Sequence, residues 1–412
     1  MNDFFKLISP SDFVALFADF APLESETVPL TAARGRILAE QLISNEALPP
    51  FSRSTMDGYA VRAADTFGCS ESETALLTVI GEIAMGASGQ ALTLRPGQAA
   101  RIWTGGELPQ KADAVVMVEY TQPFDEETVG IFRPVAPGEN VIRAGEDYAP
   151  GTVVLDRGDR LRPQDLGVLS GLGITEVSVY RRPRVAILST GDELVPADQT
   201  PPPGKIRDIN STTLAALVEE TGGIAHTYGI CDDDFDRMLA VCTRALAEAD
   251  VLLLSGGSSV GQRDFTQRVF AAIPGSQMLV HGVSVRPGKP TILARQDNKA
   301  LFGLPGHVAS ALVVFTCFVR PLLRQYSGLG ATLGLATVKA ITAQQIPSVI
   351  GREDYVRVRL TAQEGGAPPL ATPVYGKSGL LNPLVRADGL LPIGRDVEGL
   401  DKGVEAAVLL FP

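Results

Sequence analysis

The sequence is poor in the residues that build the commonest zinc and disulfide sites. Its 412 residues include only four cysteines and three histidines. The cysteines are Cys69, Cys231, Cys242 and Cys317, and the histidines are His226, His281 and His307. No C-x-x-C or H-E-x-x-H spacing occurs, and a chain of this length needs no disulfide framework. We therefore expect reduced, mostly buried thiols and no structural zinc site.

Two further signals are missing, namely a catalytic signature and an excess of positive charge. The glycine-rich turn over 255–261 lacks the Gly-Lys-Ser/Thr of a P-loop, and no Cys/His pairing suggests covalent catalysis. Lys and Arg total 36 against 47 Asp and Glu, which gives a formal net charge of -11. This balance argues against nonspecific binding to nucleic acid or to an anionic membrane. An anionic substrate would have to meet a local basic group or a bound cation.

The sequence also has no run that is long and apolar enough for a membrane span. The longest apolar run, 308–319, contains Ser310 and Thr316 and is shorter than the roughly 20 residues required. The N-terminus has no basic segment followed by an apolar one, since Lys6 and Asp12 interrupt it. A soluble, cytoplasmic protein is the expectation.

The length predicts two to four domains, and the pattern of elements suggests where they divide. Helices are expected over 11–20 and 30–37, and short strands without helices follow between 53 and 141. We therefore predict a discontinuous N-terminal domain of mixed structure (1–45 and 142–176) and a β domain inserted into it (46–141). An α/β domain (177–327) and a C-terminal β domain (328–412) complete the prediction.

Three apolar runs in the α/β segment each lead into a turn rich in glycine and serine. Residues 185–188 lead into 189–193, 251–254 into 255–261, and 301–302 into 303–307. Such runs, alternating with helix-length segments, predict a parallel sheet covered on both faces. Ligands bind outside the carboxyl ends of such strands, and glycine-rich turns suit phosphate. The segment therefore predicts a site for a nucleotide-like or phosphorylated ligand.

Several residues of this segment have a functional and a structural interpretation. Ser255, Gly256 and Gly257 would let a ligand approach the backbone closely, or they would form a flexible turn. Arg286 and Lys289 flank a stiff Pro-Gly turn and could bind an oxyanion, or they could be solvated surface bases. His307 could cap the last helix or contact a ligand. Acids in loops could bind Mg²⁺ or simply cap turns; they are Asp57, Asp147, Glu193, Asp233 and Asp264. Asp208 and Asn210 are candidate caps of the helix over 211–221.

Seven motifs occur in the order found in one enzyme family. They are Met56-Asp57-Gly58-Tyr59-Ala60-Val61, Thr104-Gly105, Gly145-Glu146-Asp147, Ser189-Thr190-Gly191-Asp192-Glu193-Leu194, Ser255-Gly256-Gly257 with Val260-Gly261 and Asp264, Pro287-Gly288-Lys289-Pro290, and Gly303-Leu304-Pro305-Gly306. In these motifs, spread over nearly the whole chain, the sequence resembles molybdopterin molybdenumtransferases, the family of bacterial MoeA and the gephyrin E domain.

The resemblance implies a molybdopterin-binding, doubly wound α/β domain and a C-terminal domain like a β-barrel. It implies a homodimer with its active cleft between subunits. The implied reaction is the final step of molybdenum cofactor synthesis, in which molybdate enters adenylylated molybdopterin and AMP leaves. Mg²⁺ is the implied cation. An adenylyltransferase upstream and molybdoenzymes or their chaperones downstream are the implied partners, with no role for nucleic acid or membranes.

The resemblance also assigns residues. The catalytic centre would contain Asp57, Thr104, Asp147, Glu193, Asp233 and Asp264, of which Glu193, Asp233 and Asp264 would hold the metal. Substrate would be bound by Thr190, Gly191, Asp192, Ser255, Gly256, Gly257, Pro305, Gly306 and His307. Molybdate or phosphate would be held by Arg286 and Lys289, and by Arg352 and Ser378 through a looser match.

The sequence departs from the family's pattern at three positions and leaves alternatives open. Arg286 stands where many relatives have Lys, His307 where Asn is usual, and Gly282 where some relatives carry a basic residue. Tungstate is therefore an alternative to molybdate. A second hypothesis is that the chain is the adenylyltransferase that makes the adenylylated intermediate, because that enzyme shares the α/β domain. A gephyrin-like scaffold is a third, although no additional N-terminal domain or long Pro/Ser-rich linker supports it.

Overall fold

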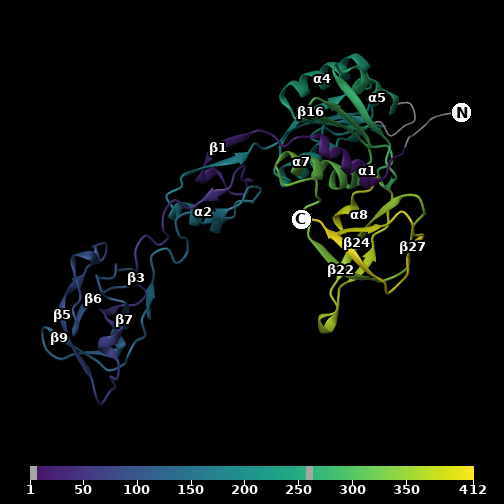
Figure 1. Cartoon of the computed structure of the whole chain (residues 1–412). Helices are drawn as coiled ribbons and strands as arrows, with labels where there is room; N and C mark the ends of the chain where they lie inside the picture. The colour runs from purple at the N-terminus through teal and green to yellow at the C-terminus, as the bar shows by residue number, and fades with distance from the viewer. Residues whose placement is uncertain (1–6, 257–262) are drawn as a thin grey trace. The chain divides into compact units, whose positions relative to one another are not determined.

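The computed structural model describes residues 7–256 and 263–412 and divides into two compact units (Figure 1). Unit 1 contains the chain up to Glu26, Gly35–Ala39 and Ser178–Pro412, and unit 2 contains Thr27–Arg34 and Glu40–Val177. Each unit has hydrophobic clusters of its own, so each has its own core.

A six-stranded sheet with the order β16-β13-β17-β21-β20-β18 forms the centre of unit 1. The first four strands are parallel, and β20 and β18 continue the sheet with antiparallel pairs. In sheet order, the strands span Ile224–Cys231, Arg184–Thr190, Val251–Gly256, Lys299–Leu304, Ile292–Gln296 and Ser276–His281. The three apolar runs singled out in the sequence are thus the adjacent strands β13, β17 and β21.

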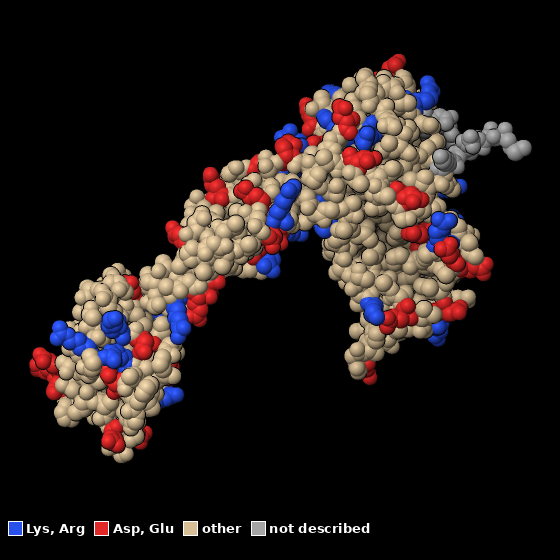
Figure 2. Space-filling model, viewed as in Figure 1, with Lys and Arg blue, Asp and Glu red and all other residues tan. Residues whose placement is uncertain are grey.

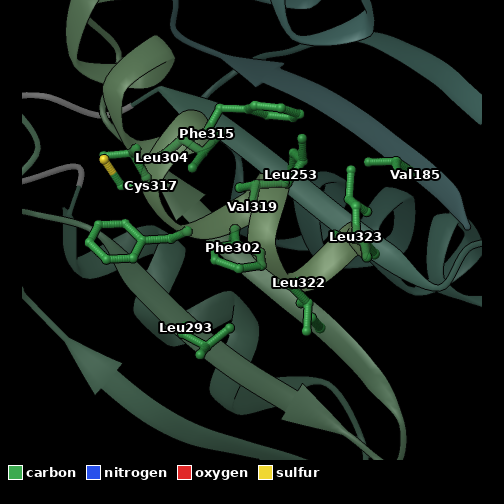
Figure 3. Close-up of a cluster of buried hydrophobic side chains, with 14 of the residues drawn as sticks. Val185, Leu253, Leu293, Phe302, Leu304, Phe315, Cys317, Val319, Leu322 and Leu323 are labelled. Atoms are coloured by element: carbon green, nitrogen blue, oxygen red, sulfur yellow. The ribbon is translucent and has the colours of Figure 1, made fainter. Parts of the chain in front are cut away.

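Alternate side chains of these strands enter two separate cores. Val185 and Ile187 belong to one buried cluster, and their neighbours Ala186 and Leu188 belong to the other. Since successive side chains of a strand point to opposite faces, both faces of this sheet are covered. Figure 3 shows the first cluster, in which Val185, Leu253 and Phe302 of the sheet lie among side chains such as Leu323 of the covering helices.

Helices cover the two faces of the sheet. The first face carries α1 (Pro10–Ala15), α3 (Asn210–Glu220), α6 (Val308–Val314) and α7 (Arg320–Tyr326), the last two joined by the π-helical turn η6 (Phe315–Val319). The second carries α4 (Phe235–Glu248) and α5 (Arg263–Ala272). The N-terminus of α4 is capped by Asp234, whose side chain accepts a hydrogen bond from the amide of Arg237 at 2.8 Å.

The segment Val308–Tyr326 is long and apolar enough to cross a membrane by composition alone. However, 78% of its most apolar window is buried inside the protein, against the sheet and α1. We therefore assign the segment Val308–Tyr326 as the core helix of the α/β domain.

The C-terminal segment of unit 1 forms a closed five-stranded barrel. Its strands follow each other around the barrel as β24, β25, β22, β28 and β26, and β26 pairs with β24 to close it. They span Glu353–Thr361, Leu370–Pro373, Thr337–Thr342, Glu405–Leu410 and Gly389–Ile393, and α8 spans Asn382–Val385. The short strand β19 (Val285–Arg286), which belongs to the α/β segment, pairs with β24 at the edge. This pairing joins the barrel to the α/β domain.

Other short elements of unit 1 are η1 (Leu16–Asp19), β14 (Leu194–Val195), β15 (Ile206–Arg207), β23 (Ile346–Pro347), η7 (Glu364–Gly366) and β27 (Gly399–Leu400).

Unit 2 is built around a second six-stranded sheet, with the order β7-β4-β6-β5-β9-β8. In that order the strands span Ala114–Met117, Gly58–Val61, Gln98–Ile102, Ala75–Ile83, Thr128–Ile131 and Thr121–Pro123. Two short antiparallel strand pairs each join a segment before this sheet to a segment after it in the sequence. They are β3 (Arg53–Ser54) with β10 (Val141–Ile142), and β2 (Leu42–Ile43) with β11 (Val153–Leu155). The strands of the six-stranded sheet are thus inserted, in sequence, between the two chain segments that form the region of β2 and α2 (Pro163–Gly171).

The remaining 3-10 turns of unit 2 are η2 (Leu30–Ala32), η3 (Ala63–Thr66), η4 (Gly89–Ala91) and η5 (Val118–Tyr120). The units divide within β1 (Ser25–Pro29) and β12 (Glu176–Tyr180).

The structure differs from the sequence predictions near the N-terminus. Residues 10–20, which we grouped with 142–176, contribute Phe13, Phe17 and Phe20 to the core of the α/β domain. The predicted helix over 30–37 was wrong, because only a 3-10 turn, η2, forms there. Gly35 has φ +76°, a left-handed conformation that ends helical geometry. The other domain boundaries stay predictions.

Candidate functional site

Three strands of the unit 1 sheet end side by side. Thr190, the last residue of β13, lies opposite Gly256, the last of β17. Ser255 in turn lies opposite Leu304, the last residue of β21. The turns that follow are therefore gathered at one edge, the position at which open α/β sheets bind ligands. Gly257 and the remainder of the turn up to 262 lie outside the described residues.

Gly256 is a position at which only glycine fits. Its φ is +153°, and a Cβ atom built there would lie 2.1 Å from the carbonyl oxygen of Thr190. Residues with side chains rarely adopt this conformation, and the backbone of β13 leaves no room for one. The structure thus explains Gly256 by the close approach of the β13 backbone, and the predicted approach of a ligand there stays a prediction.

Asn210, the first residue of α3, ties two of the three turns together. Its side-chain amide donates to Oγ of Ser255 at 2.7 Å and to the carbonyl of Gly306 at 2.8 Å. The residue is only 9% exposed. Sequence reasoning treated Asn210 only as a helix cap, since an Asn before a helix has that meaning far more often. Because both partners lie far away in the sequence, no local pattern indicated that Asn210 connects the two turns.

The turns enclose a pocket of about 210 Å³. Its lining is Thr190, Glu193, Leu194, 206–210, Ser255, Gly256, Gly306, His307, Val308 and Gly379. Five predicted substrate-binding residues, Thr190, Ser255, Gly256, Gly306 and His307, therefore line one pocket, together with Glu193. Buried Pro305 lies in the same turn as Gly306. Hydroxyls and backbone amides at such an edge are suited to phosphate oxygens.

Acidic side chains lie beside this pocket, at the ends of β13 and β16. The hydroxyl of Thr190 donates to Oδ1 of Asp233 at 2.8 Å, and the amide of Asp233 donates to Oδ1 of Asp192 at 3.2 Å. Gly191 also contacts this strand end through its amide, which donates to the carbonyl of Cys231 at 3.4 Å. The structure thus connects Thr190, Gly191, Asp192 and Asp233, which the resemblance assigned to one site.

The donor chemistry of these acids fits a divalent cation in part. Among the described residues, no group of three His, Cys, Asp or Glu side chains could hold a metal ion. Glu193 and Asp233 supply the carboxylate oxygens that Mg²⁺ prefers. The third predicted ligand, Asp264, lies in the first turn of α5, but its side chain is outside the described part of the structure.

A cluster of arginines lies where β19 of the α/β segment meets the barrel. The carboxylate of Asp354 is 3% exposed and accepts from Nη1 of Arg286 at 3.3 Å and from Nε of Arg352 at 3.0 Å. Lys289 follows in the same turn and is exposed. Gly288 allows the turn to pack tightly, because a Cβ atom there would lie 2.6 Å from the Val314 side chain. The predicted oxyanion residues Arg286 and Arg352 are thus linked through an acid that the motif comparison did not select.

His307 connects the strand-end pocket to the barrel. It occupies the N-cap position of α6, but its side chain caps nothing. Instead, Nδ1 of His307 lies 2.7 Å from Oγ of Ser378, and the amide of Ala309 donates to the carbonyl of Ser378 at 3.1 Å. The loosely matched Ser378 is therefore held directly beside a predicted substrate-binding residue.

The remaining predicted catalytic residues lie in unit 2. Oδ1 of Asp57 accepts from the amide of Thr104 at 2.7 Å and from its hydroxyl at 2.8 Å. These two bonds hold the pKa of Asp57 below its ordinary value, and the charge of Arg101 lowers it further. The Arg101 guanidinium lies over the ring of Trp103, 4.8 Å from its centroid, an arrangement that the sequence did not indicate. Asp147 lies exposed in a separate bend after β10.

Comparison with known proteins identifies the family of this chain. The model for the MoeA N-terminal region (domain I and II) matches residues 8–173. The model described as "Probable molybdopterin binding domain" matches 186–325, and that for the MoeA C-terminal region (domain IV) matches 339–411. The chain belongs to the MoeA family. All residues that line its strand-end pocket, except Gly379, lie within the part matched by the molybdopterin-binding model.

Full-length relatives support membership in the MoeA family. A molybdopterin molybdenumtransferase of Nostoc sp. is 36% identical over 394 residues, which is 94% of this chain and 89% of the relative. One of Bacillus subtilis is 34% identical over 392 residues, 94% of this chain and 90% of the relative. A solved molybdopterin biosynthesis MoeA protein of Pyrococcus horikoshii has a TM-score of 0.85 at 36% identity, covering 99% of this chain and 100% of the other.

These matches confirm the predicted family and fold class. The chain is a multidomain MoeA-type protein with a doubly wound α/β domain, β-rich N-terminal regions and a C-terminal barrel. Its family places it among transferases of molybdenum cofactor biosynthesis. Molybdopterin is accordingly the class of small molecule that the family implies.

Proposed function

We propose that this MoeA-family chain inserts molybdate into adenylylated molybdopterin and releases AMP. The observation that carries the proposal is the strand-end pocket, which Asn210 joins to the turn after β21 and which Glu193 lines. It offers hydroxyls and amides for a phosphate, and basic side chains for an oxyanion lie at the barrel in the same unit. A site with both features suits a substrate pair that consists of a pyrophosphate and a tetrahedral oxyanion.

The residues of the pocket have defined tasks in this proposal. Thr190, Ser255 and Gly256 bind the phosphorylated end of the pterin, and Asp192 and Asp233 hold the turn after β13 in place through the bonds to Thr190 and to each other. Gly257 is proposed to continue this surface, and Pro305 to fix the turn beneath it. Fixed donors of this kind stabilise charge that develops on the leaving phosphate.

Basic residues would meet the oxyanion. In the view of Figure 2, acidic and basic side chains are interspersed over the surface, and the chain as a whole carries a net charge of -11. An anion is therefore attracted only where the fold gathers basic groups. Arg286, Lys289 and Arg352 line one pocket beside β19 and are proposed to receive molybdate there. Ser378 is proposed to contribute its hydroxyl from the barrel.

Mg²⁺ would be held by Glu193, Asp233 and Asp264. Bound there, it would offset the charge of the pyrophosphate and polarise it for cleavage. Asp57, Thr104 and Asp147 of unit 2 are proposed as further catalytic residues. The hydrogen bonds from Thr104 keep Asp57 ionised. We also propose a cytoplasmic homodimer that receives its substrate from an adenylyltransferase and passes its product to molybdoenzymes or their chaperones.

The decisive experiment supplies adenylylated molybdopterin, Mg²⁺ and either molybdate or tungstate. AMP release and activation of a cofactor-free molybdoenzyme are both followed. We expect both to require the oxyanion and the divalent cation, and both to fall in Asp57→Ala. AMP release that is independent of the oxyanion, with no activation of the apoenzyme, would contradict the proposal. Pyrophosphate release from ATP with unadenylylated molybdopterin would identify an adenylyltransferase instead.

A further inference from the structure

A group of charged and aromatic side chains lies beside Asp57 and Thr104 in unit 2. Arg101 of β6 lies directly opposite Tyr59 of β4 in their antiparallel pairing. Asp57 comes immediately before β4, and Thr104 comes two residues after β6. The two strands therefore bring Arg101 to a pair of residues that we propose as catalytic, although no motif of the sequence selected this arginine.

The guanidinium of Arg101 is fixed by two aromatic side chains. Its Nη1 donates to the hydroxyl of Tyr59 at 3.1 Å, and its Cζ lies 5.6 Å from the centroid of the Tyr59 ring. The same Cζ lies 4.8 Å from the centroid of the Trp103 ring, whose Nε1 donates to Oε1 of Glu82 at 2.8 Å. A hydrogen bond and cation–π contacts thus hold the charged group, so that little further freedom is lost when a ligand binds.

The positive charge of Arg101 is held without being neutralised. Its contacts are a neutral hydroxyl and two ring faces, and across 7–256 and 263–412 it forms no salt bridge. Its other two nitrogens, Nε and Nη2, have no hydrogen-bond partner within these ranges and are not sealed from solvent. These nitrogens form one edge of the guanidinium, and such an edge can bind two oxygens of a phosphate side by side.

Asp57 needs a positive charge beside it if an anionic substrate is to approach. Its Oδ1 accepts both hydrogen bonds of Thr104, which leaves Oδ2 without a partner among the described residues. The bonds from Thr104 lower the pKa of Asp57, and the charge of Arg101 lowers it further, so the carboxylate is ionised and lies within range of the guanidinium. A pyrophosphate beside Asp57 would be repelled by this carboxylate, and Arg101 would offset the repulsion.

We propose that Arg101 is a further substrate-binding residue, which contacts the pyrophosphate of adenylylated molybdopterin beside Asp57 through Nε and Nη2. Tyr59 and Trp103 are then positioning residues that hold its guanidinium. This inference rests on the proposed function and adds to it a residue that receives the anionic group of the substrate in unit 2.

Equilibrium binding to the intact chain tests Arg101 without requiring turnover. Inorganic pyrophosphate is titrated calorimetrically into the native protein, Arg101→Gln, Arg101→Lys and the matched control Arg133→Gln. Arg133 is exposed, follows β9 and lies over an aromatic ring too, 4.3 Å from the centroid of Tyr120. We expect Arg101→Gln to weaken pyrophosphate binding about tenfold or more, Arg101→Lys to weaken it several-fold, and Arg133→Gln to leave it within about twofold.

The fluorescence of Trp103 locates the bound ion. Trp103 is the only tryptophan of the chain, so all tryptophan emission comes from the ring that lies beside the Arg101 guanidinium. Pyrophosphate should change this emission in the native protein with the dissociation constant that calorimetry gives. Trp103→Leu should weaken binding several-fold, and Trp103→Phe should restore most of it, because Phe keeps a ring face for Arg101. Equal binding by these two variants would refute the positioning role.

Four results would overturn the assignment of Arg101. They are an absence of saturable pyrophosphate binding by the native protein, binding that leaves the Trp103 emission unchanged, native affinity in folded Arg101→Gln, and equal weakening in the Arg133→Gln control. If Arg101→Gln does not fold, Arg101→Lys decides, because it keeps the charge while losing the planar pair of donors, and native affinity in that variant refutes the assignment.

Two further measurements separate the pyrophosphate from molybdate and the inference from the proposed function. Weakened molybdate binding in Arg101→Gln with unchanged pyrophosphate binding refutes the assignment to pyrophosphate. With molybdate saturating, Arg101→Gln should raise the KM for adenylylated molybdopterin about tenfold. Molybdate-dependent AMP release with an unchanged KM sinks the inference alone. AMP release that needs no molybdate, while pyrophosphate binding still depends on Arg101, sinks the proposed function alone.

Discussion

The side chain of Asn210 provides the sharpest test of how the strand-end pocket is held together. Replacement by Ala removes two hydrogen bonds, to Ser255 Oγ at 2.7 Å and to the Gly306 carbonyl at 2.8 Å. Ser255 is 1% exposed, so water cannot readily replace the lost donor. At about 1–2 kcal/mol for each buried bond, Asn210→Ala should lower the free energy of unfolding by roughly 2–4 kcal/mol. This corresponds to a decrease in Tm of about 4–10 °C for a domain of this size.

The same substitution should weaken substrate binding more than it slows the chemical step. Asn210 holds the turn after β21 against the end of β17, and both belong to the pocket. Without it the two turns separate, so the donors for the phosphorylated substrate are no longer fixed in position. We expect the KM for adenylylated molybdopterin to rise several-fold, to about tenfold. The Tm is measured by calorimetry and the KM by AMP release under saturating molybdate.

Thr212→Ala is the matched control, because Thr212 is exposed in the same first turn of α3. It should change the free energy of unfolding by no more than about 0.5 kcal/mol and leave the KM unchanged. A Tm for Asn210→Ala within 1 °C of the native value would show that the two bonds contribute little. A large loss of stability with an unchanged KM would show that Asn210 supports the fold but not the pocket.

Substitutions at three further positions probe other parts of the sites. Gly256→Ala should destabilise unit 1 by several kcal/mol, since a Cβ atom would lie 2.1 Å from a backbone oxygen of β13, and a Tm equal to that of the native protein would contradict this. Thr104→Val should raise the pKa of Asp57 toward its ordinary value, as NMR titration of the carboxyl group would show. Because the folded pKa of Asp57 is depressed, its contribution to stability is present above the unfolded pKa of about 4 and lost as pH falls through the folded value. Val should reduce this pH dependence without abolishing it, because the backbone amide of residue 104 still donates to Asp57. His307→Leu should raise the KM for molybdate, whereas His307→Asn, which can still donate a hydrogen bond, should preserve it, and equal effects would exclude hydrogen bonding by this side chain.

The location of the strand-end pocket could be predicted because it depends on local sequence patterns. Four consecutive apolar residues before Ser189 and before Ser255 indicate strands buried on both faces, and parallel strands necessarily end at one edge. The resemblance then supplied residue roles along the chain. The structure brings several of them, such as Thr190 with Asp233 and Asp57 with Thr104, into direct contact.

The residues that sequence reasoning missed all act through long-range contacts. Asn210 bonds to residues 45 and 96 positions away, and Asp354 pairs with Arg286 across 68 positions. Nothing in the local pattern separates Asn210 from an ordinary cap, or Arg357 from its exposed neighbour Arg359. Alternation along β24 places both arginines outside the barrel, and only the packing of the segment around Gly376 buries one of them.

Asp354 shows how one buried acid can hold two basic side chains in place beside a pocket. Without a nearby acid, Arg286 and Arg352 would each be free to take many positions and would lose that freedom on binding. The buried carboxylate fixes both, at the cost of offsetting part of their charge. Arg357 is fixed differently, through the carbonyl of Gly376, which positions the guanidinium without neutralising it.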